Sequence, residues 1–295
     1  MISLVLLLWT GCDIPPRYVS QSDVGDAFIQ ERYKTVCKGL EMSEDETRKY
    51  AAEKLASLKQ PLARDCICEN IETPEGSWDP AIAKGLVSTR FPEVVECFTR
   101  LVERPDLPDR LEAVVVLKGI NTSNARDTLA KVVRGEGDDE VRAKAMEGIS
   151  GNSQYQELFL ELLASPTETP AVRAAAAKAM AGLKAKLVAS TLTRAATEDA
   201  EPEVRGAALG ALRSAGAKGV DELICKSMME DESPLVRRKA VLAFKGTKRS
   251  GPVACLRDRA LTLEEDAGVR DALLTVLKSS PSDDAAKILC DAIPF

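Results

Sequence analysis

Histidine is absent from all 295 residues of the chain. This absence excludes catalysis by Ser–His or Cys–His pairs and any metal site with histidine ligands. Aromatic residues make up only 4% of the chain, which is low for a β-sandwich or for a surface that stacks nucleic-acid bases. Positive charge is not in excess, because 40 basic residues face 46 acidic ones and the net charge is −6. A general nucleic-acid-binding function is therefore disfavoured.

Apolar residues, in contrast, are plentiful enough to build a core. They make up 45% of the chain, against 29% charged residues, which is the balance of a folded protein. The sequence has no phosphate-binding loop, no dinucleotide fingerprint and no nucleophile elbow. We therefore predict no catalytic residue, no metal site and no cofactor.

The N-terminus carries a short apolar run over 2–9, which ends in small residues followed by Cys12. The run is too short to span a bilayer as a helix, which takes roughly 20 apolar residues. The order resembles the lipobox of bacterial lipoproteins, although Trp9 stands where leucine is usual. This resemblance implies a signal peptide over 1–11, an acylated Cys12 and a linker over 12–20. It also implies lipid anchoring in the bacterial envelope, on the periplasmic side or in the outer membrane. The alternative is an apolar tail on a cytosolic protein, with an ordinary thiol.

The rest of the chain repeats itself at intervals of 31 to 33 residues. Valine precedes the repeated arginine in five of six copies. A small residue follows three positions later, or two in the last copy, and a large apolar residue follows seven positions later. These positions form one stripe of a helix. The six arginines are Arg110, Arg142, Arg173, Arg205, Arg237 and Arg270.

Helix boundaries accompany the stripe. Thr169, Ser233 and Asp266 stand four residues before their arginines, where a side-chain oxygen can cap a helix. Glycine follows nine residues after the arginine in four copies and is expected to end the helix in a left-handed conformation. Further amphipathic segments lie between these helices, for example 156–163 and 220–229. Each repeat is therefore predicted to be a helical hairpin, and hairpins must stack to bury their apolar faces.

The pattern of an acid, Thr or Ser followed by Pro-x-Val-Arg-x-x-Ala, clearest over 169–176, 201–208 and 233–240, resembles the HEAT-repeat family in its short bacterial form, also known as bilin-lyase-type repeats. The resemblance covers about 92–295 and implies an all-α fold, an α-solenoid of stacked hairpins.

The segment before the repeats, 21–91, is predicted to be an N-terminal helical cap that contains cysteines. Helices are expected over 24–40 and 43–58, the second with a capping box formed by Ser43 and Glu46. A short helix is expected to follow Asp79.

Two interpretations of the arginine column are open. Arginines at this spacing line up along one edge of a solenoid, where they could grip an acidic ligand. The favoured interpretation is structural, because a guanidinium held by an acid or carbonyl of the adjoining repeat fixes the register. Nearby acids offered as partners are Asp138, Asp139, Glu140, Glu201 and Glu203.

The chain has eight cysteines. In an oxidising envelope, those other than Cys12 suggest disulfides; they are Cys37, Cys66, Cys68, Cys97, Cys225, Cys255 and Cys290. We expect Cys37 to pair with Cys66 or Cys68, Cys97 to pair with the other, and one pair among the last three to bridge adjacent repeats. Free thiols and a four-thiolate zinc site are the alternatives.

The function favoured by these features is a non-catalytic, membrane-anchored scaffold that binds a protein or peptide partner, since stacked helices present an extended surface. No nucleic-acid partner is expected. One alternative is a bilin-lyase-like enzyme, which only the family resemblance suggests. The other is a cytosolic assembly or regulatory scaffold, if the N-terminus is not a signal.

Overall fold

A computed structural model describes residue 24 and residues 33–72, 78–87, 91–107, 110–247, 249–262, 264–280 and 287–288. The chain divides into two compact units, Met1–Gly148 and Ile149–Phe295, and each is considered by itself. Regular structure in the described residues is helical, apart from one isolated β-bridge between Glu72 and Trp78. None of the described helices has the length and apolar character needed to cross a membrane.

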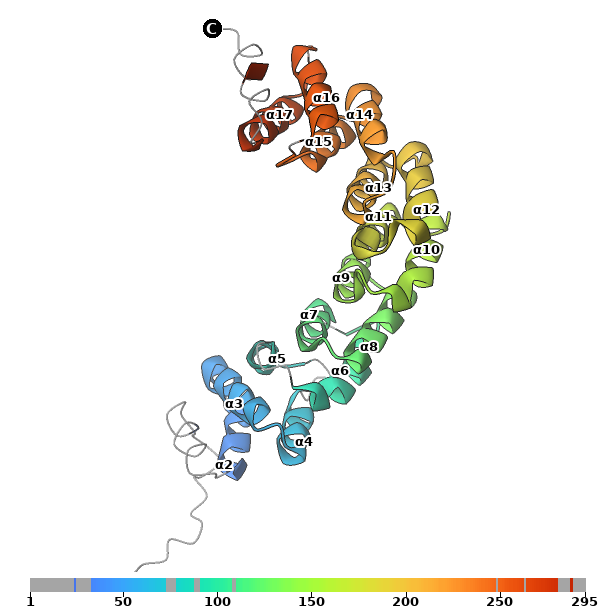
Figure 1. Cartoon of the computed structure of the whole chain (residues 1–295). Helices are drawn as coiled ribbons and strands as arrows, with labels where there is room; N and C mark the ends of the chain where they lie inside the picture. The colour runs from blue at the N-terminus through green and yellow to red at the C-terminus, as the bar shows by residue number, and fades with distance from the viewer. Residues whose placement is uncertain are drawn as a thin grey trace, which may run out of the picture. The chain divides into compact units, whose positions relative to one another are not determined.

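The first unit contains helices α2 to α9 (Figure 1). Their bounds are α2 Tyr33–Lys38, α3 Asp45–Leu58, α4 Pro61–Asn70, α5 Pro80–Leu86, α6 Val95–Val102, α7 Arg110–Ile120, α8 Ser123–Arg134 and α9 Asp139–Ile149, with 3-10 turns η1 Gly39–Glu41 and η2 Pro92–Val94.

The second unit contains helices α10 to α17. Their bounds are α10 Gln156–Ala164, α11 Pro170–Ala179, α12 Ala185–Glu198, α13 Pro202–Ala215, α14 Val220–Glu230, α15 Pro234–Ala243, α16 Ser250–Leu261 and α17 Ala267–Ser279, with 3-10 turns η3 Ser153–Tyr155 and η4 Met180–Gly182.

Each unit is an α-solenoid. In the second unit α11, α13, α15 and α17 pack side by side in one row, which we term the arginine row (Figure 1). Helices α10, α12, α14 and α16 form the opposite row, and each packs on the next helix along the chain. The predicted all-α solenoid is confirmed.

The columns of the sequence repeat form the core of the second unit. The valines before the arginines, Val172, Val204, Val236 and Val269, are completely buried. The small residue of each copy is buried as well, and so is the large apolar residue that follows it, for instance Phe244. Burying a residue of that size contributes about 1.5–3 kcal/mol. The repeated positions of the sequence are therefore the positions that each hairpin buries in the core.

The first unit has the same two-row packing on both sides of residue 91. Helix α3 packs on α5 and α5 on α7, while α4 packs on η2, immediately before α6. Helices of the segment predicted to be the N-terminal cap thus pack in the same two rows. Helix α4, which contains Cys66 and Cys68, is not among the predicted helices. Pro61 occupies the first turn of α4, where no amide donor is needed.

Several predicted helix caps differ in the structure. Thr169 and Asp266 do accept hydrogen bonds from the amides of Val172 and Val269. The Ser233 side chain makes no capping bond. The expected capping box at Ser43 is also wrong, because Glu44 occupies the N-cap position of α3 without a side-chain bond.

Only two of the glycines nine residues after the arginines have the expected left-handed conformation. Gly151 and Gly246 have a φ of +70°, as expected. Gly119 lies inside α7, and the left-handed residue there is Asn121, with a φ of 52°. Gly182 belongs to η4, and the carbon that a side chain would add there lies 3.0 Å from the Cα of Gly151. Close approach of two backbones, rather than a positive φ, requires glycine at that position.

Candidate functional site

Three of the four repeated arginines of the second unit bind a carboxylate in the loop of the following repeat. Arg205 donates from Nε and Nη2 to both oxygens of Asp231, at 3.0 and 2.9 Å. Arg173 makes the same fork with Asp199, and Arg237 makes it with Glu264. All of these side chains are largely buried. The hydrogen bond to Asp231 raises the pKa of Arg205 above its ordinary value.

The remaining nitrogen of each guanidinium binds the loop before its own helix. Nη1 of Arg205 donates to the carbonyl oxygens of Asp199 and Ala200, at 3.0 and 3.1 Å. Arg237 and Arg270 repeat this arrangement on the loops that contain Asp231 and Glu264. Each loop is therefore held by two arginines, one through its carboxylate and the next through its carbonyls, from Arg173 to Arg270.

The arginines of the first unit bind backbone carbonyls. Nε of Arg110 donates to the carbonyl oxygen of Val102 at 2.6 Å, and Nη1 donates to that of Glu136 at 3.2 Å. Nε of Arg142 donates to the carbonyl oxygen of Val133 at 3.0 Å. Burial lowers the pKa of Arg110. The position of the arginine in the repeat is the same in both units.

We term the repeated arginines the arginine ladder. The acids that bind this ladder in the second unit are not the ones proposed from the sequence. Glu201 and Glu203 were proposed, yet the partners are Asp199, Asp231 and Glu264. These three stand six residues before an arginine, and a second column of acids in the repeat could have revealed them. Because these carboxylates occupy the guanidinium forks of their partner arginines, the ladder stabilises the stack and does not present those forks to a ligand.

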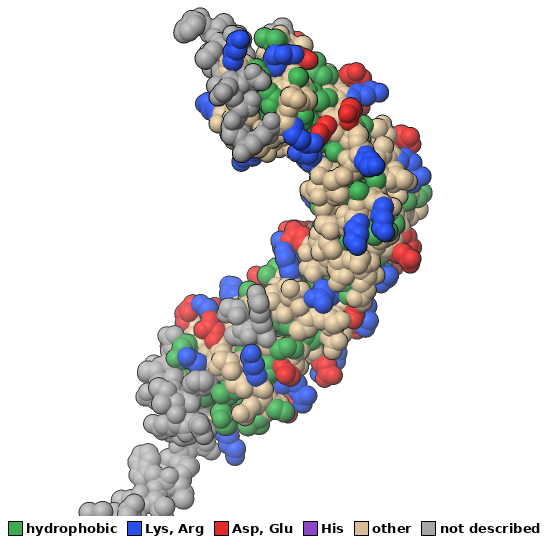
Figure 2. All heavy atoms as spheres, in the orientation of Figure 1, with side chains coloured by type: hydrophobic (Ala, Val, Ile, Leu, Met, Phe, Trp, Pro, Cys, Tyr) green, Lys and Arg blue, Asp and Glu red, His purple; other side chains and the backbone are tan. Residues whose placement is uncertain are grey.

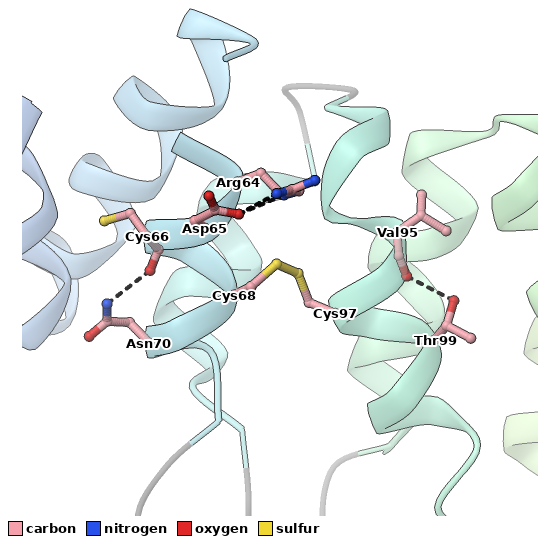
Figure 3. Close-up of a disulfide and its surroundings, with 8 residues drawn as sticks. All are labelled: Arg64, Asp65, Cys66, Cys68, Asn70, Val95, Cys97 and Thr99. Carbon is pink, nitrogen blue, oxygen red and sulfur yellow. Dashed lines mark hydrogen bonds and ion pairs between the residues drawn. A yellow bond between two sulfur atoms is a disulfide. The ribbon is translucent and has the colours of Figure 1, made fainter. Parts of the chain in front are cut away.

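Disulfides join helices of neighbouring repeats. Cys37 of α2 is bonded to Cys66 of α4, and Cys68 of α4 to Cys97 of α6, with Cα–Cα distances of 5.9 and 5.4 Å. Figure 3 shows the second bond crossing from α4 to α6. The partners are 29 residues apart in both cases, so each bond links one repeat to the next.

A third disulfide joins Cys225 of α14 to Cys255 of α16 in the second unit. Both helices belong to the opposite row, so this bond also links consecutive repeats. Cys12 and Cys290 lie outside the described residues, and the structure does not place them. Among the described residues, no group of three or more acids or cysteines is arranged to hold a metal ion.

The exposed surface is mixed in charge. Figure 2 shows positive and negative side chains interspersed over the face in view, with hydrophobic side chains in small groups between them. On the arginine row of the second unit, short residues such as Ala175 and Gly210 reach the surface. Lys178 of α11 and Lys239 of α15 lie on either side of α13 and make no ion pair with the described residues.

A family model for HEAT repeats matches residues 127–213. These residues are HEAT repeats. The match includes the repeats of Arg142, Arg173 and Arg205, and the HEAT-repeat prediction is confirmed. No curated protein matches the sequence.

Solved structures of other helical-repeat proteins are similar to this chain at low identity. Human deoxyhypusine hydroxylase is 14% identical, with 87% of this chain and 98% of that chain covered and a TM-score of 0.37. The CpcE–CpcF complex of phycocyanin lyase from Nostoc sp. is 18% identical, with 83% of this chain and 93% of that chain covered and a TM-score of 0.38. The Pds5–Scc1 complex is 14% identical, with 90% of this chain and 51% of that chain covered and a TM-score of 0.36. Similarity at this level says nothing about a shared activity.

Proposed function

We propose that this HEAT-repeat protein is a non-catalytic scaffold, anchored by lipid in the bacterial envelope, that binds a protein partner. The observation that carries the proposal is the way the stack is held together. Carboxylates, carbonyls and disulfides fix one repeat to the next, while the outward faces of the rows are left to solvent. Stacked faces of this kind form extended surfaces suited to a protein segment.

The disulfides support the envelope part of the proposal. Three cysteine pairs are bonded in the structure, joining α2 to α4, α4 to α6 and α14 to α16. Such bonds persist in oxidising compartments and are rare where thiols are kept reduced. The apolar run over 2–9 followed by Cys12 supplies the route to such a compartment and the site of the lipid.

Metabolic labelling with an alkyne fatty acid tests the anchor. The full chain is expressed in bacteria as the natural sequence and as the Cys12→Ala variant, with Cys290→Ala as a matched cysteine control. We expect label on the natural sequence and on the control, and none on the Cys12→Ala variant. Acyl chains contribute about 0.8 kcal/mol per buried CH₂, so the labelled chains should also partition into the detergent phase of Triton X-114. Equal labelling of all three chains, or no labelling of any, would contradict the proposed lipid anchor and favour a cytosolic scaffold.

A further inference from the structure

On helices α11, α13 and α15 of the second unit, four arginines pair with a carboxylate and three other basic residues do not. Lys178 of α11 and Arg238 and Lys239 of α15 make no ion pair or hydrogen bond with the described residues. Two acids lie on the same row, Glu203 on α13 and Asp271 on α17, and both are exposed. The face is thus basic in a chain whose net charge is −6.

Lys239 is held in place by α13. A side-chain carbon added to Gly206 would collide with Cδ of Lys239 and would lie 3.4 Å from its Nζ. The lysine stem therefore lies across Gly206 and carries its ammonium over α13. Burial, and to a smaller extent Lys178, lower the pKa of Lys239, against a weaker opposing effect of Glu203. The Lys239 ammonium therefore lies over α13, and Lys178 belongs to the helix that packs on the other side of α13.

The surroundings of this lysine pair are small or apolar. A side-chain carbon added to Gly210 would meet no atom within 4 Å, so open space lies above that turn of α13. Along α15, Leu235, Arg238 and Leu242 follow one another at helical spacing, and Leu242 is 37% exposed. A segment of a partner that lies on α13 can therefore bring its backbone close to this helix. It can also reach the two lysines and the apolar side chains of α15.

We propose that the face of α11, α13 and α15 binds an acidic amphipathic segment of a protein partner. One carboxylate of the segment lies between Lys178 and Lys239, and its apolar side chains contact Leu235 and Leu242. This proposal rests on the proposed scaffold function and assigns its binding face.

Charge complementarity favours such a segment over a nucleic acid or an anionic membrane. Affinity for polyphosphate grows with the number of phosphates neutralised, and this face offers few cations. Glu203 and Asp271 border the cations and repel a uniformly anionic surface, whereas a segment with discrete carboxylates can avoid them. Leu235 and Leu242 add an apolar contact that a phosphate backbone cannot use.

Site-specific photo-crosslinking in bacteria that make the full chain tests the proposal. The crosslinking amino acid p-benzoylphenylalanine is placed at Gly210, where there is space for it, and in a second chain at exposed Thr193 on α12 of the opposite row. The crosslinked peptide is sequenced by mass spectrometry. We expect the Gly210 position to capture a protein segment with several carboxylates and exposed apolar residues.

Charge variants make the test specific. The double variant Lys178→Glu, Lys239→Glu should reduce capture at Gly210 by roughly tenfold or more, since like charges then oppose the segment. Lys239→Arg should preserve capture, and Arg194→Glu on the opposite row is the matched charge reversal that should leave it unchanged. Circular dichroism during urea titration checks that every variant folds.

The outcomes separate this proposal from the proposed function. Capture of a neutral or basic segment, a lipid or a nucleic acid at Gly210 overturns the acidic-segment proposal, and so does capture that ignores the charge reversal. Capture of a protein from Thr193 alone also overturns it, while the scaffold function survives. Absence of protein capture from both positions counts against the scaffold function itself.

Discussion

Three arginines at the repeated position bind a carboxylate that stands six residues before the next arginine of the repeat. The carboxylate belongs to Asp199, Asp231 or Glu264, and the guanidinium of the preceding repeat makes a two-pronged bond to it. The same carboxylate accepts a hydrogen bond from the backbone amide of the residue two positions later, as Asp231 does from Ser233. It therefore fixes the loop and the neighbouring repeat together.

Replacing Arg205 tests this role. Arg205→Ala leaves the buried carboxylate of Asp231 without its guanidinium, so the free energy of unfolding should fall by about 3–5 kcal/mol. Arg205→Lys keeps the charge but not the fork and should lose less. Urea titration followed by circular dichroism measures both.

The control for this experiment is Arg257, whose side chain is 54% exposed and pairs with Asp258. Arg257→Ala should change the free energy of unfolding by less than about 0.5 kcal/mol. If both alanine variants lose the same amount, the fork in the loop is not what stabilises the stack.

At the scale of helices, the disulfides lie between consecutive repeats and not within hairpins. The spacing of 29 or 30 residues between partners is close to one repeat length. Helices one repeat apart in a row are neighbours, so equivalent positions on them come within reach. This is why α4 uses Cys66 toward α2 and Cys68 toward α6.

Alkylation of the denatured chain, with and without prior reduction, tests the three disulfides. Six of the eight cysteines should react only after reduction, which intact mass measures. The double variant Cys68→Ser, Cys97→Ser should lower the free energy of unfolding of the first unit by about 2–4 kcal/mol. Reaction of all described cysteines without reduction would show that the bonds do not form.

At the scale of the whole molecule, contacts are made by neighbouring repeats, and stability in such arrays is close to a sum of local terms. Glu264 contributes to one such local term through two arginines, because it binds Arg237 and also contacts Arg259. Both arginines are largely buried. Burial lowers the pKa of Arg259.

Hydrogen exchange of a Glu264→Ala variant tests this locality. With the carboxylate removed, two buried guanidinium groups lose their anion, so amides of α15 to α17 should exchange faster. Amides of α3 and α5 should keep their protection, because opening free energies are local in such arrays. Glu265→Ala, which changes the exposed neighbouring acid, is the control. Equal acceleration throughout the chain would contradict the additive behaviour.

The candidate site could be predicted only in part. The arginine column and the cysteine positions were recognisable because repetition makes them stand out. The column of Asp199, Asp231 and Glu264 was missed because acids are common in loops, and only packing selects which acid meets a guanidinium. Nothing in the sequence indicated that the Lys239 side chain lies across Gly206 of the neighbouring helix, because that contact depends on how α13 and α15 pack.

The sequence by itself determined the helical hairpins, their stacking and the residues of the core, since a periodic apolar stripe has no other way to leave water than against the next copy of itself. The tertiary structure alone decided which cysteines pair, which carboxylates receive the arginines and which cations have no partner. Those outcomes depend on distances of a few ångström between residues about one repeat apart, and such distances are set by how the helices pack, not by the order of residues along the chain.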